Sequence, residues 1–236
     1  MTIDILTVLP ELLTGALDYS IVGRARAQHI AEIALHNLRD YTHDKRRTVD
    51  DYAYGPDAGM VMKPDPIFEA VEHLQASGGA YDEIIYTAPD GELLTQSLAT
   101  ELSLKPRLLI LCGHYKGVDQ RVRDHLVTRE ISIGDYILSG GELAAAVIVD
   151  SIVRLLPGAL GDATSALSDS FQDGLVSPPA YTRPENFRGW EVPPILRSGN
   201  FPEIAKWQHA EALRLTAERR PALLQQYLER TTLSEE

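Results

Sequence analysis

Two glycine-bearing blocks hold the residues of this sequence best suited to binding a ligand. One is Leu111-Cys-Gly-His-Tyr-Lys-Gly117 and the other is Ile131-Ser-Ile-Gly-Asp-Tyr-Ile-Leu-Ser-Gly-Gly-Glu142. Each places glycines after a run of aliphatic residues, which is typical of strands that end in loops with accessible backbone N–H and C=O groups. Neither block contains GxGxxG or GxxxxGK[ST]. The blocks therefore predict a ligand read mainly through backbone contacts, and not a nucleoside triphosphate.

Asp169 and Arg154 are candidate catalytic residues. A carboxylate such as Asp169 could act as a general base once a closing loop removes water from it. Arg154, at the end of an apolar stretch, could stabilise a developing anion through charge-assisted hydrogen bonds. By residue type alone a simpler interpretation is favoured for each residue. Asp169 would be an ordinary turn residue, and Arg154 would complement the dipole of a helix. His114 and His125 lack partners at metal-ligand spacing, so no structural zinc site is predicted.

Segments with strand and helix patterns alternate along the chain, and they must position these residues. Strands are predicted at Ile3–Leu9, Ile30–Leu38, Tyr81–Ala88, Arg107–Cys112 and Glu130–Ile133. One helix is predicted to begin at Pro10, and further helices are predicted at Pro66–Leu74, Leu93–Leu102, Val118–Leu126 and Glu142–Leu155. This alternation predicts an α/β fold with a mostly parallel sheet. Residues 40–60 have neither period and predict a long loop, which in a compact domain is usually functional or disordered.

The helix predicted over Glu142–Leu155 is apolar on nearly every face, so it must be buried on more than one side. In a chain of this size we interpret that as contact with another subunit, the alternative being a central helix of a monomer. Residues 161–180 read as a linker rich in Gly, Ser, Asp and Pro. Helices are predicted beyond it at Glu203–Glu218 and Pro221–Glu229, which gives an α/β domain at 1–160 and a small helical domain at 181–236.

Composition limits the classes of protein and partner. The chain has 236 residues, a net charge of −12 and one cysteine, Cys112, which fits a reducing cytoplasm. No apolar run is long enough to span a membrane, and the first residues lack the pattern of a signal peptide. The acidic charge disfavours indiscriminate nucleic-acid binding. Residues 183–230 nevertheless carry a net charge of +2, so they could bind RNA locally, although an ordinary solvated helix surface has the same composition.

Five blocks occur in a fixed order and are more specific together than any one alone. They are Thr48-Val-Asp-Asp-x-x-Tyr-Gly55, Cys112-Gly-x-Tyr-x-Gly-Val-Asp119, Ser132-Ile-Gly-Asp-Tyr-x-Leu-x-Gly-Gly-Glu142, Asp169-Ser-Phe-x-Asp-Gly-Leu175 and Tyr181-Thr-Arg-Pro-Glu185. Over nearly its whole length the chain resembles the bacterial tRNA (guanine-N1)-methyltransferases, the TrmD family of the SPOUT superfamily. The resemblance implies a deep trefoil knot at the C-terminal end of the α/β domain, followed by a small all-helical domain that binds tRNA.

The resemblance also implies a reaction and a site. The family moves a methyl group from S-adenosylmethionine to N1 of the guanosine 3′ of the anticodon, at position 37. It works as a homodimer, and a magnesium requirement is attributed to it. By similarity Asp169 is the general base, Arg154 stabilises negative charge on the purine O6, and Arg214, Arg219 and Arg220 hold the anticodon stem. The implied cofactor-binding residues are Tyr86, Pro89, Gly91, Gly113, Tyr115, Gly117, Ile133, Gly134, Asp135, Tyr136, Ile137, Leu138, Gly140 and Gly141.

The chain departs from the family pattern in its second block. The commonest form there is Cys-Gly-Arg-Tyr-Glu-Gly, whereas this chain has His114 and Lys116. The glycine run after Tyr-Gly is replaced by Pro56-Asp-Ala-Gly59, and Ala180 stands where a histidine is common. Two alternatives to an active enzyme of this family follow: an RNA-binding dimer without catalysis, and a related methyltransferase that acts on another RNA. The sequence assigns neither the tRNA species nor metal ligands.

Overall fold

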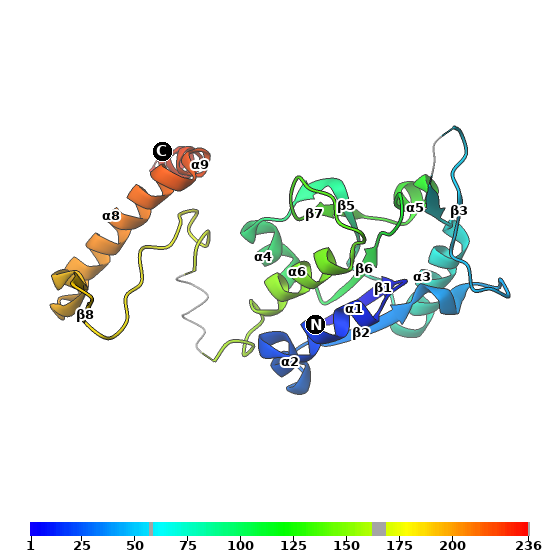
Figure 1. The fold of residues 1–236 in the computed structure, drawn as a ribbon, viewed down its shortest axis with the longest axis horizontal. Helices are drawn as coiled ribbons and strands as arrows, with labels where there is room; N and C mark the ends of the chain where they lie inside the picture. Colours follow the sequence, from blue (N-terminus) through cyan, green and yellow to red (C-terminus); the bar gives the residue numbers. More distant parts are fainter. Residues whose placement is uncertain (57–58, 162–168, 236) are drawn as a thin grey trace. The chain divides into compact units, whose positions relative to one another are not determined.

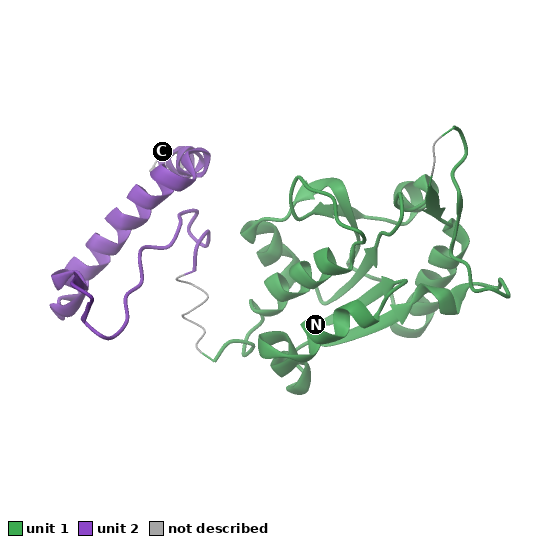
Figure 2. Cartoon of the chain, viewed as in Figure 1, with its two compact units in different colours: residues 1–161 green, residues 162–236 purple. Residues whose placement is uncertain are grey.

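The computed structural model describes residues 1–56, 59–161 and 169–235 (Figure 1). The chain divides into two compact units, Met1–Gly161 and Asp162–Glu236 (Figure 2). Among the described residues, no helix combines the length and the apolar character that crossing a membrane requires. The first unit contains the glycine-bearing blocks and Arg154, and the second contains Asp169.

The first unit is built on a parallel sheet. Within the described residues its strands, in spatial order, are β2 (Glu32–Asn37), β1 (Thr2–Thr7), β6 (Arg107–Cys112), β5 (Glu83–Leu93) and β7 (Arg129–Ser132). Every pairing in this sheet is parallel. These strands are rich in Ile and Leu because helices cover both faces of a parallel sheet. The predicted α/β fold with a mostly parallel sheet is confirmed.

Alternate residues of the inner strands β1, β6 and β5 enter two separate cores. Leu108 and Ile110 of β6 pack into one apolar cluster, and Leu109 and Leu111 into the other. The first cluster is covered by α1 (Glu11–Asp18), α2 (Ser20–Ala27), α4 (Gln96–Ser103) and α6 (Glu142–Val153). The second is covered by α3 (Pro64–Gly78), α5 (Gln120–His125) and the 3-10 helix η1 (Leu38–Tyr41). Figure 1 shows the helices on the two faces of the sheet.

Three local predictions were wrong. Residues 40–60, predicted as loop, include part of η1 and an antiparallel pair, β3 (Asp50–Tyr52) and β4 (Met60–Met62). Hydrogen bonds to a distant segment stabilise this strand pair: the Met62 N–H donates to the Gly117 carbonyl, and the Asp119 N–H donates to the Met62 carbonyl. Helix α2 was not predicted, and Leu93 pairs in β5 instead of starting a helix. In each case long-range contacts outweigh the local pattern.

Helix α6 is buried along most of its surface. Ala145, Ile148 and Ile152 are fully buried, as its apolar sequence predicts. One strip remains open, because the side chains of Leu143 and Val147 are 56% and 46% exposed. Residues four apart lie on the same face of a helix, so this strip is a continuous apolar edge.

The second unit contains α8 (Phe201–Arg219), α9 (Pro221–Glu235) and the 3-10 helix η2 (Pro194–Arg197). It is not all-helical, because β8 (Asn186–Phe187) and β9 (Trp190–Glu191) form a short antiparallel ribbon. Arg188 and Gly189 both have positive φ, as a two-residue hairpin turn requires. The later part of the predicted linker packs on α8: Leu175 is buried and the Val176 N–H donates to the Thr216 hydroxyl.

A buried polar cluster lies near the start of the sheet and predicts a pH-dependent contribution to stability. The Asp4 carboxylate is 2.7 Å from His36 Nε2, 2.8 Å from the Tyr81 hydroxyl and 3.3 Å from the Arg107 guanidinium. Burial alone would raise the pKa of Asp4, but the hydrogen bonds from His36 and Tyr81 outweigh it and lower that pKa. The charged form therefore stabilises the fold at neutral pH, and this contribution is lost as the pH falls below about 4.

Asp4→Asn is accordingly expected to lower the free energy of unfolding by about 1–3 kcal/mol at pH 7. The difference in free energy of unfolding between Asp4→Asn and the wild type should become smaller as the pH falls from about 5 to 3, because the wild-type carboxylate is then protonated. Urea unfolding at several pH values measures both effects. Asp18→Asn removes a partly exposed ion pair with Arg26 and is the control, with an expected change below about 1 kcal/mol. If the difference in free energy of unfolding did not depend on pH, the pH-dependent stability could not be assigned to ionisation of Asp4.

Candidate functional site

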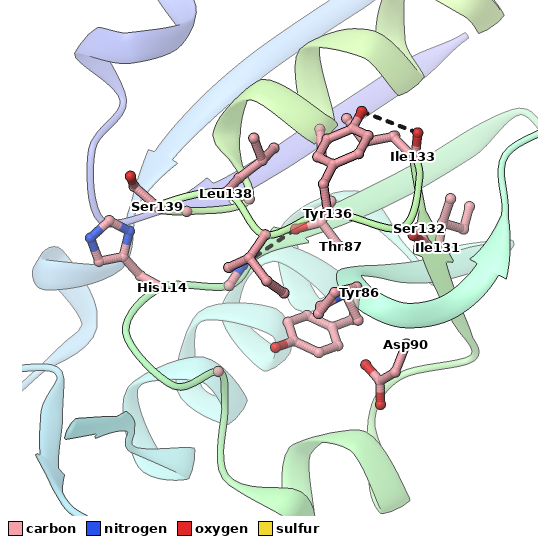
Figure 3. Close-up of a pocket in the computed structure, with 18 of the residues that line it drawn as sticks. Tyr86, Thr87, Asp90, His114, Ile131, Ser132, Ile133, Tyr136, Leu138 and Ser139 are labelled. Atoms are coloured by element: carbon pink, nitrogen blue, oxygen red, sulfur yellow. Dashed lines mark hydrogen bonds between the residues drawn. The ribbon is translucent and has the colours of Figure 1, made fainter. Parts of the chain in front are cut away.

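A cavity of about 440 Å³ lies at the carboxyl ends of β5, β6 and β7 (Figure 3). Three segments form it: the irregular part of β5 at residues 88–91, which leaves the ladder with β7 and is called the 88–91 loop below, and the loops 113–117 and 133–141. Its volume falls in the range of small-molecule pockets, and the carboxyl edge of a parallel sheet is where such ligands usually bind. The lining includes twelve predicted cofactor-binding residues: Tyr86, Pro89, Gly113, Tyr115, Gly117, Ile133, Gly134, Tyr136, Ile137, Leu138, Gly140 and Gly141.

The two other predicted residues are placed differently. Gly91 and Asp135 are not among the described residues that line the cavity. Asp135 is exposed, whereas a Cβ on Gly91 would lie 2.5 Å from the carbonyl carbon of Glu130. Thr87 and Glu92 both pair with Ile131, so residues 88–91 leave the ladder and return to it at this glycine. Gly91 therefore allows the loop to form and does not itself line the cavity.

Several lining residues were not predicted. They are Thr87, Ala88, Asp90, His114, Lys116, Arg123, Ile131, Ser132, Ser139 and Ala144. Five of them lie inside the two glycine-bearing blocks and Ala144 follows the second block, so proximity in sequence was an available signal for these six. Thr87, Ala88 and Asp90 come from β5, and Arg123 comes from α5, so only the tertiary structure brings these four to the cavity.

Gly141 and Gly113 bring two of the loops into backbone contact. The Gly141 N–H donates to the Gly113 carbonyl at 2.7 Å. A Cβ on Gly141 would lie 1.9 Å from Thr87 Oγ1 and 2.8 Å from the Gly113 nitrogen, and one on Gly113 would lie 2.9 Å from the Tyr86 ring. No larger residue fits at either position without a shift. The glycines thus leave peptide groups, and not side chains, to meet a ligand.

Tyr86 forms the floor below these loops and is almost fully buried. Burial raises the pKa of its phenol, because the phenolate would lose solvation. Tyr86 therefore stays neutral at physiological pH and supplies an aromatic surface. Figure 3 shows it beside Thr87 and Asp90, with Tyr136 on the loop above. The Tyr136 hydroxyl donates to the Ile133 carbonyl at 3.2 Å, which folds that loop onto itself.

Arg123 forms ion pairs with two carboxylates at one wall. Its guanidinium donates to Asp90 and to Glu130, in both cases at 2.7 Å. Hydrogen bonds to Glu130 and Asp90 raise the pKa of Arg123, and the hydrogen bond from Arg123 lowers the pKa of Asp90. Its positive charge is thus already compensated within the protein. The network ties α5 to the 88–91 loop and to β7, which fixes the shape of the wall.

A buried carboxylate, Glu142, lies behind the opposite wall. It accepts a hydrogen bond from the Thr7 hydroxyl at 2.7 Å and is 1% exposed. His114 Nδ1 lies 3.9 Å from this carboxylate and has no hydrogen-bond partner in the described part of the chain. Burial, together with the charge of Glu142, raises the pKa of the Cys112 thiol well above its ordinary value. Cys112 is therefore an unreactive core residue.

Neither candidate catalytic residue is among the described residues that line this cavity. Arg154 is the C-cap of α6, whose N-terminus adjoins the cavity at Gly141. A helix of this length places its ends about 18 Å apart. Asp169 belongs to the second unit, where it lines a cavity of about 270 Å³ with Asp173, Gln208 and His209. The structure therefore brings the predicted cofactor-binding residues together, whereas Arg154 lies at the far end of α6 and Asp169 belongs to the other compact unit.

The residues expected to hold RNA also have defined surroundings. Arg214 is paired with Glu211 at 2.7 Å and with Glu218 at 3.1 Å. The Arg220 guanidinium lies over the ring of Phe171. In residues 1–56, 59–161 and 169–235, no group of three or more His, Cys, Asp or Glu side chains is arranged to hold a metal ion. The magnesium implied by the resemblance is therefore assigned no ligands.

Comparison with known proteins places the chain in a family. The family model described as "tRNA (Guanine-1)-methyltransferase TrmD" matches residues 1–226. A tRNA (guanine-N(1)-)-methyltransferase of Flavobacterium psychrophilum is 56% identical over 224 residues, which are 95% of this chain and 99% of the relative. Those of Porphyromonas gingivalis and Bacteroides thetaiotaomicron are each 55% identical, over 95% of this chain and 99% and 100% of the relatives. The chain therefore belongs to the tRNA (guanine-1)-methyltransferase TrmD family.

Proposed function

We propose that this protein transfers a methyl group from S-adenosylmethionine to N1 of the guanosine 3′ of the anticodon, position 37, in tRNA. The observation that carries the proposal is the identity of 55–56% over 95% of the chain to relatives named tRNA (guanine-N(1)-)-methyltransferase. The cavity in the first unit supplies a suitable cofactor site. Because the substrate is tRNA, the reaction belongs in the cytoplasm.

The cavity suits S-adenosylmethionine in shape and chemistry. Ile133, Ile137, Leu138 and Ala144 give apolar walls for the adenine ring. Around Gly141, where a Cβ would overlap Thr87, only a bare backbone fits, so peptide groups are free to bind the polar edge of the nucleoside. When bound, the cofactor supplies an electrophilic methyl group on its sulfonium. The protein residues hold and orient it.

The three loops are the segments that the trefoil knot of the family would involve. The 133–141 loop returns to the 113–117 loop, where Gly140 forms a bridge with His114 and the Gly141 N–H donates to Gly113. The next residue, Glu142, accepts a hydrogen bond from Thr7 at the end of β1. These ties between distant segments support a knotted site, in which the crossing chains hold the loops rigid before a cofactor arrives.

In the proposed mechanism, protein groups make N1 of guanine nucleophilic. N1 carries a proton in neutral guanine, and Asp169 accepts that proton as the N1–methyl bond forms and the methyl–sulfur bond breaks. The products are 1-methylguanosine, the neutral thioether S-adenosylhomocysteine and protonated Asp169. Arg154 stabilises the negative charge that deprotonation places on the purine O6. General-base action typically contributes about 10²–10⁴-fold to such a rate.

The position of Arg154 and the exposed apolar strip of α6 favour a homodimer in which the partner completes each site. Arg154 is about 18 Å along α6 from the cavity of its own chain, too far to reach a base bound there. Leu143 and Val147 of α6 are exposed, and so is Leu12 on α1, which contacts α6. Pairing these apolar surfaces across a twofold axis would bury them. The partner's α6 terminus and second unit would then reach the cofactor.

The β8–β9 ribbon supports RNA binding by the second unit. Trp190 and Phe187 are 71% and 52% exposed, their ring centres are 6.2 Å apart, and the Arg188 guanidinium lies over the Phe187 ring. Aromatic rings flanked by arginine bind unstacked bases by stacking and the phosphates by charge. Since Arg214 is paired with two glutamates, we assign more of the RNA contact to this ribbon than to α8.

Trp190→Ala is expected to weaken tRNA binding about tenfold, because loss of one base–aromatic stack costs about 1–3 kcal/mol. Fluorescence anisotropy with labelled tRNA at fixed salt concentration measures the change. Leu228→Ala removes another exposed apolar side chain, on α9, and is the control that should bind normally. Equal affinities for wild type and Trp190→Ala would remove the ribbon from the RNA interface.

The proposed function is tested with labelled S-adenosylmethionine and unmodified tRNA transcripts. One transcript carries guanosine 3′ of the anticodon, and a matched one carries adenosine there. Incorporation into the guanosine transcript alone supports the proposal. Cofactor and tRNA binding without incorporation would instead support an RNA-binding dimer without catalysis, and incorporation elsewhere in the RNA would support a related methyltransferase of different specificity.

A further inference from the structure

The two cationic side chains that line the described cofactor cavity differ in their ion pairs. Arg123 is paired with Asp90 and Glu130, so it offers no free positive charge to a ligand. Lys116 lines the same cavity, and among the described residues its ammonium group has no ion-pair partner. Of the lysines and arginines that line the described cavity, Lys116 alone is therefore free to bind an anion.

The backbone around Lys116 is held in place. Its N–H donates to the Met60 carbonyl at 3.1 Å, and the Met62 N–H donates to the Gly117 carbonyl at 3.0 Å. The 113–117 loop is thereby joined to β4, the strand that the sequence did not predict.

The aliphatic part of Lys116 is also positioned. It lies across Gly59, where a Cβ would be 2.9 Å from the lysine Cε and 3.0 Å from Cδ. Gly59 has a positive φ of 117°, so glycine is favoured there for its conformation as well as its size. Packing of the long stem lets a lysine present its ammonium group at little further entropic cost.

We propose that Lys116 binds the carboxylate of the methionyl part of S-adenosylmethionine and so selects adenosyl compounds that carry this carboxylate. The inference rests on the proposed function. A carboxylate placed in a cavity loses solvation and needs a compensating charge or hydrogen bonds. Among the described residues of the lining, Lys116 is the one cation without an ion-pair partner. An RNA phosphate is the competing anion, and the cofactor carboxylate is favoured because Lys116 lines the cavity.

The test compares two cofactor-like ligands that differ in the methionyl group. S-adenosylhomocysteine has the carboxylate, and 5′-methylthioadenosine has the same nucleoside and sulfur without it. Isothermal titration calorimetry with the full-length protein measures both affinities. Lys116→Met keeps the stem that packs on Gly59 and removes the charge. Lys116→Arg keeps the charge, and thermal melting checks that both variants are folded.

We expect Lys116→Met to weaken S-adenosylhomocysteine binding about tenfold, as loss of a charge-assisted contact predicts. Binding of 5′-methylthioadenosine should change less than about twofold, and Lys116→Arg should retain most of the affinity for S-adenosylhomocysteine. Increasing salt should weaken S-adenosylhomocysteine binding to the wild type more than to Lys116→Met.

Three results would overturn the inference. Unchanged affinity of Lys116→Met for S-adenosylhomocysteine would mean that backbone amides hold the carboxylate. Equal loss for both ligands would mean that Lys116 only maintains the loop. Weaker tRNA binding with unchanged S-adenosylhomocysteine binding would assign the lysine to a phosphate. In all three, cofactor binding by the wild type keeps the proposed function intact, whereas a wild type that binds neither ligand would reject both proposals.

Discussion

Asp169→Asn is expected to lower the rate of methyl transfer about a thousandfold while leaving cofactor affinity unchanged. Asparagine keeps the size of the side chain but cannot accept the N1 proton, so guanine remains a poor nucleophile. Asp169 lies in the second unit and the cofactor cavity in the first, so binding should not depend on it. Single-turnover methyl transfer and calorimetric titration with S-adenosylhomocysteine measure the two effects separately.

Asp173→Asn is the matched control, because Asp173 lines the same small cavity of the second unit as Asp169. It should retain most of its single-turnover activity if Asp169 alone is the base. Equal loss of rate and of cofactor affinity in Asp169→Asn would contradict that assignment and indicate a structural role.

A mixing experiment tests whether the base comes from the partner subunit. Asp169→Asn and Gly141→Ala are each expected to be inactive, the first without a base and the second without a cofactor site. When they exchange subunits in equal amounts, each mixed dimer would contain one intact site. About a quarter of the wild-type activity should therefore return. No recovery, with exchange verified by a tag on one subunit, would place base and cofactor in the same chain.

Gly141→Ala is expected to weaken cofactor binding about a hundredfold. The added Cβ would lie 1.9 Å from Thr87 Oγ1, 2.8 Å from the Gly113 nitrogen and 3.0 Å from the Cys112 Cα. Two of these atoms belong to backbone held in the sheet or its hydrogen-bonded loop, so the 133–141 loop itself must move. Calorimetric titration with S-adenosylhomocysteine measures the loss.

Gly15→Ala is the control for Gly141→Ala. Gly15 lies in α1 with no atom within 4 Å of an added Cβ, so alanine there should preserve binding and slightly raise the melting temperature. The double variant Gly141→Ala with Thr87→Ala removes the closest overlap but leaves those with the backbone, so it should recover only part of the affinity. Full recovery would show that Thr87 alone restricts residue 141, and unchanged affinity in Gly141→Ala would refute the close fit.

The sequence by itself determined the α/β class, most strand positions and the family. Arg107–Cys112 was predicted as a strand and is one, because an aliphatic run of this short length is typical of a buried strand. The glycine blocks predicted backbone contact with a ligand, and Gly113 and Gly141 do line the cavity without room for a side chain. Such features depend on local conformation and residue size, which a sequence records directly.

Tertiary structure decided what depends on contacts between distant segments. The β3–β4 pair, the position of Arg123 and the anchoring of Lys116 on Gly59 result from residues far apart in the chain. No local period encodes such contacts, because their free energy comes from pairing and packing formed only in the folded chain. The same reason leaves the surroundings of Arg154 and Asp169 to the tertiary structure. Sequence similarity names them as catalytic, but only the fold places them at a helix end and in a second unit.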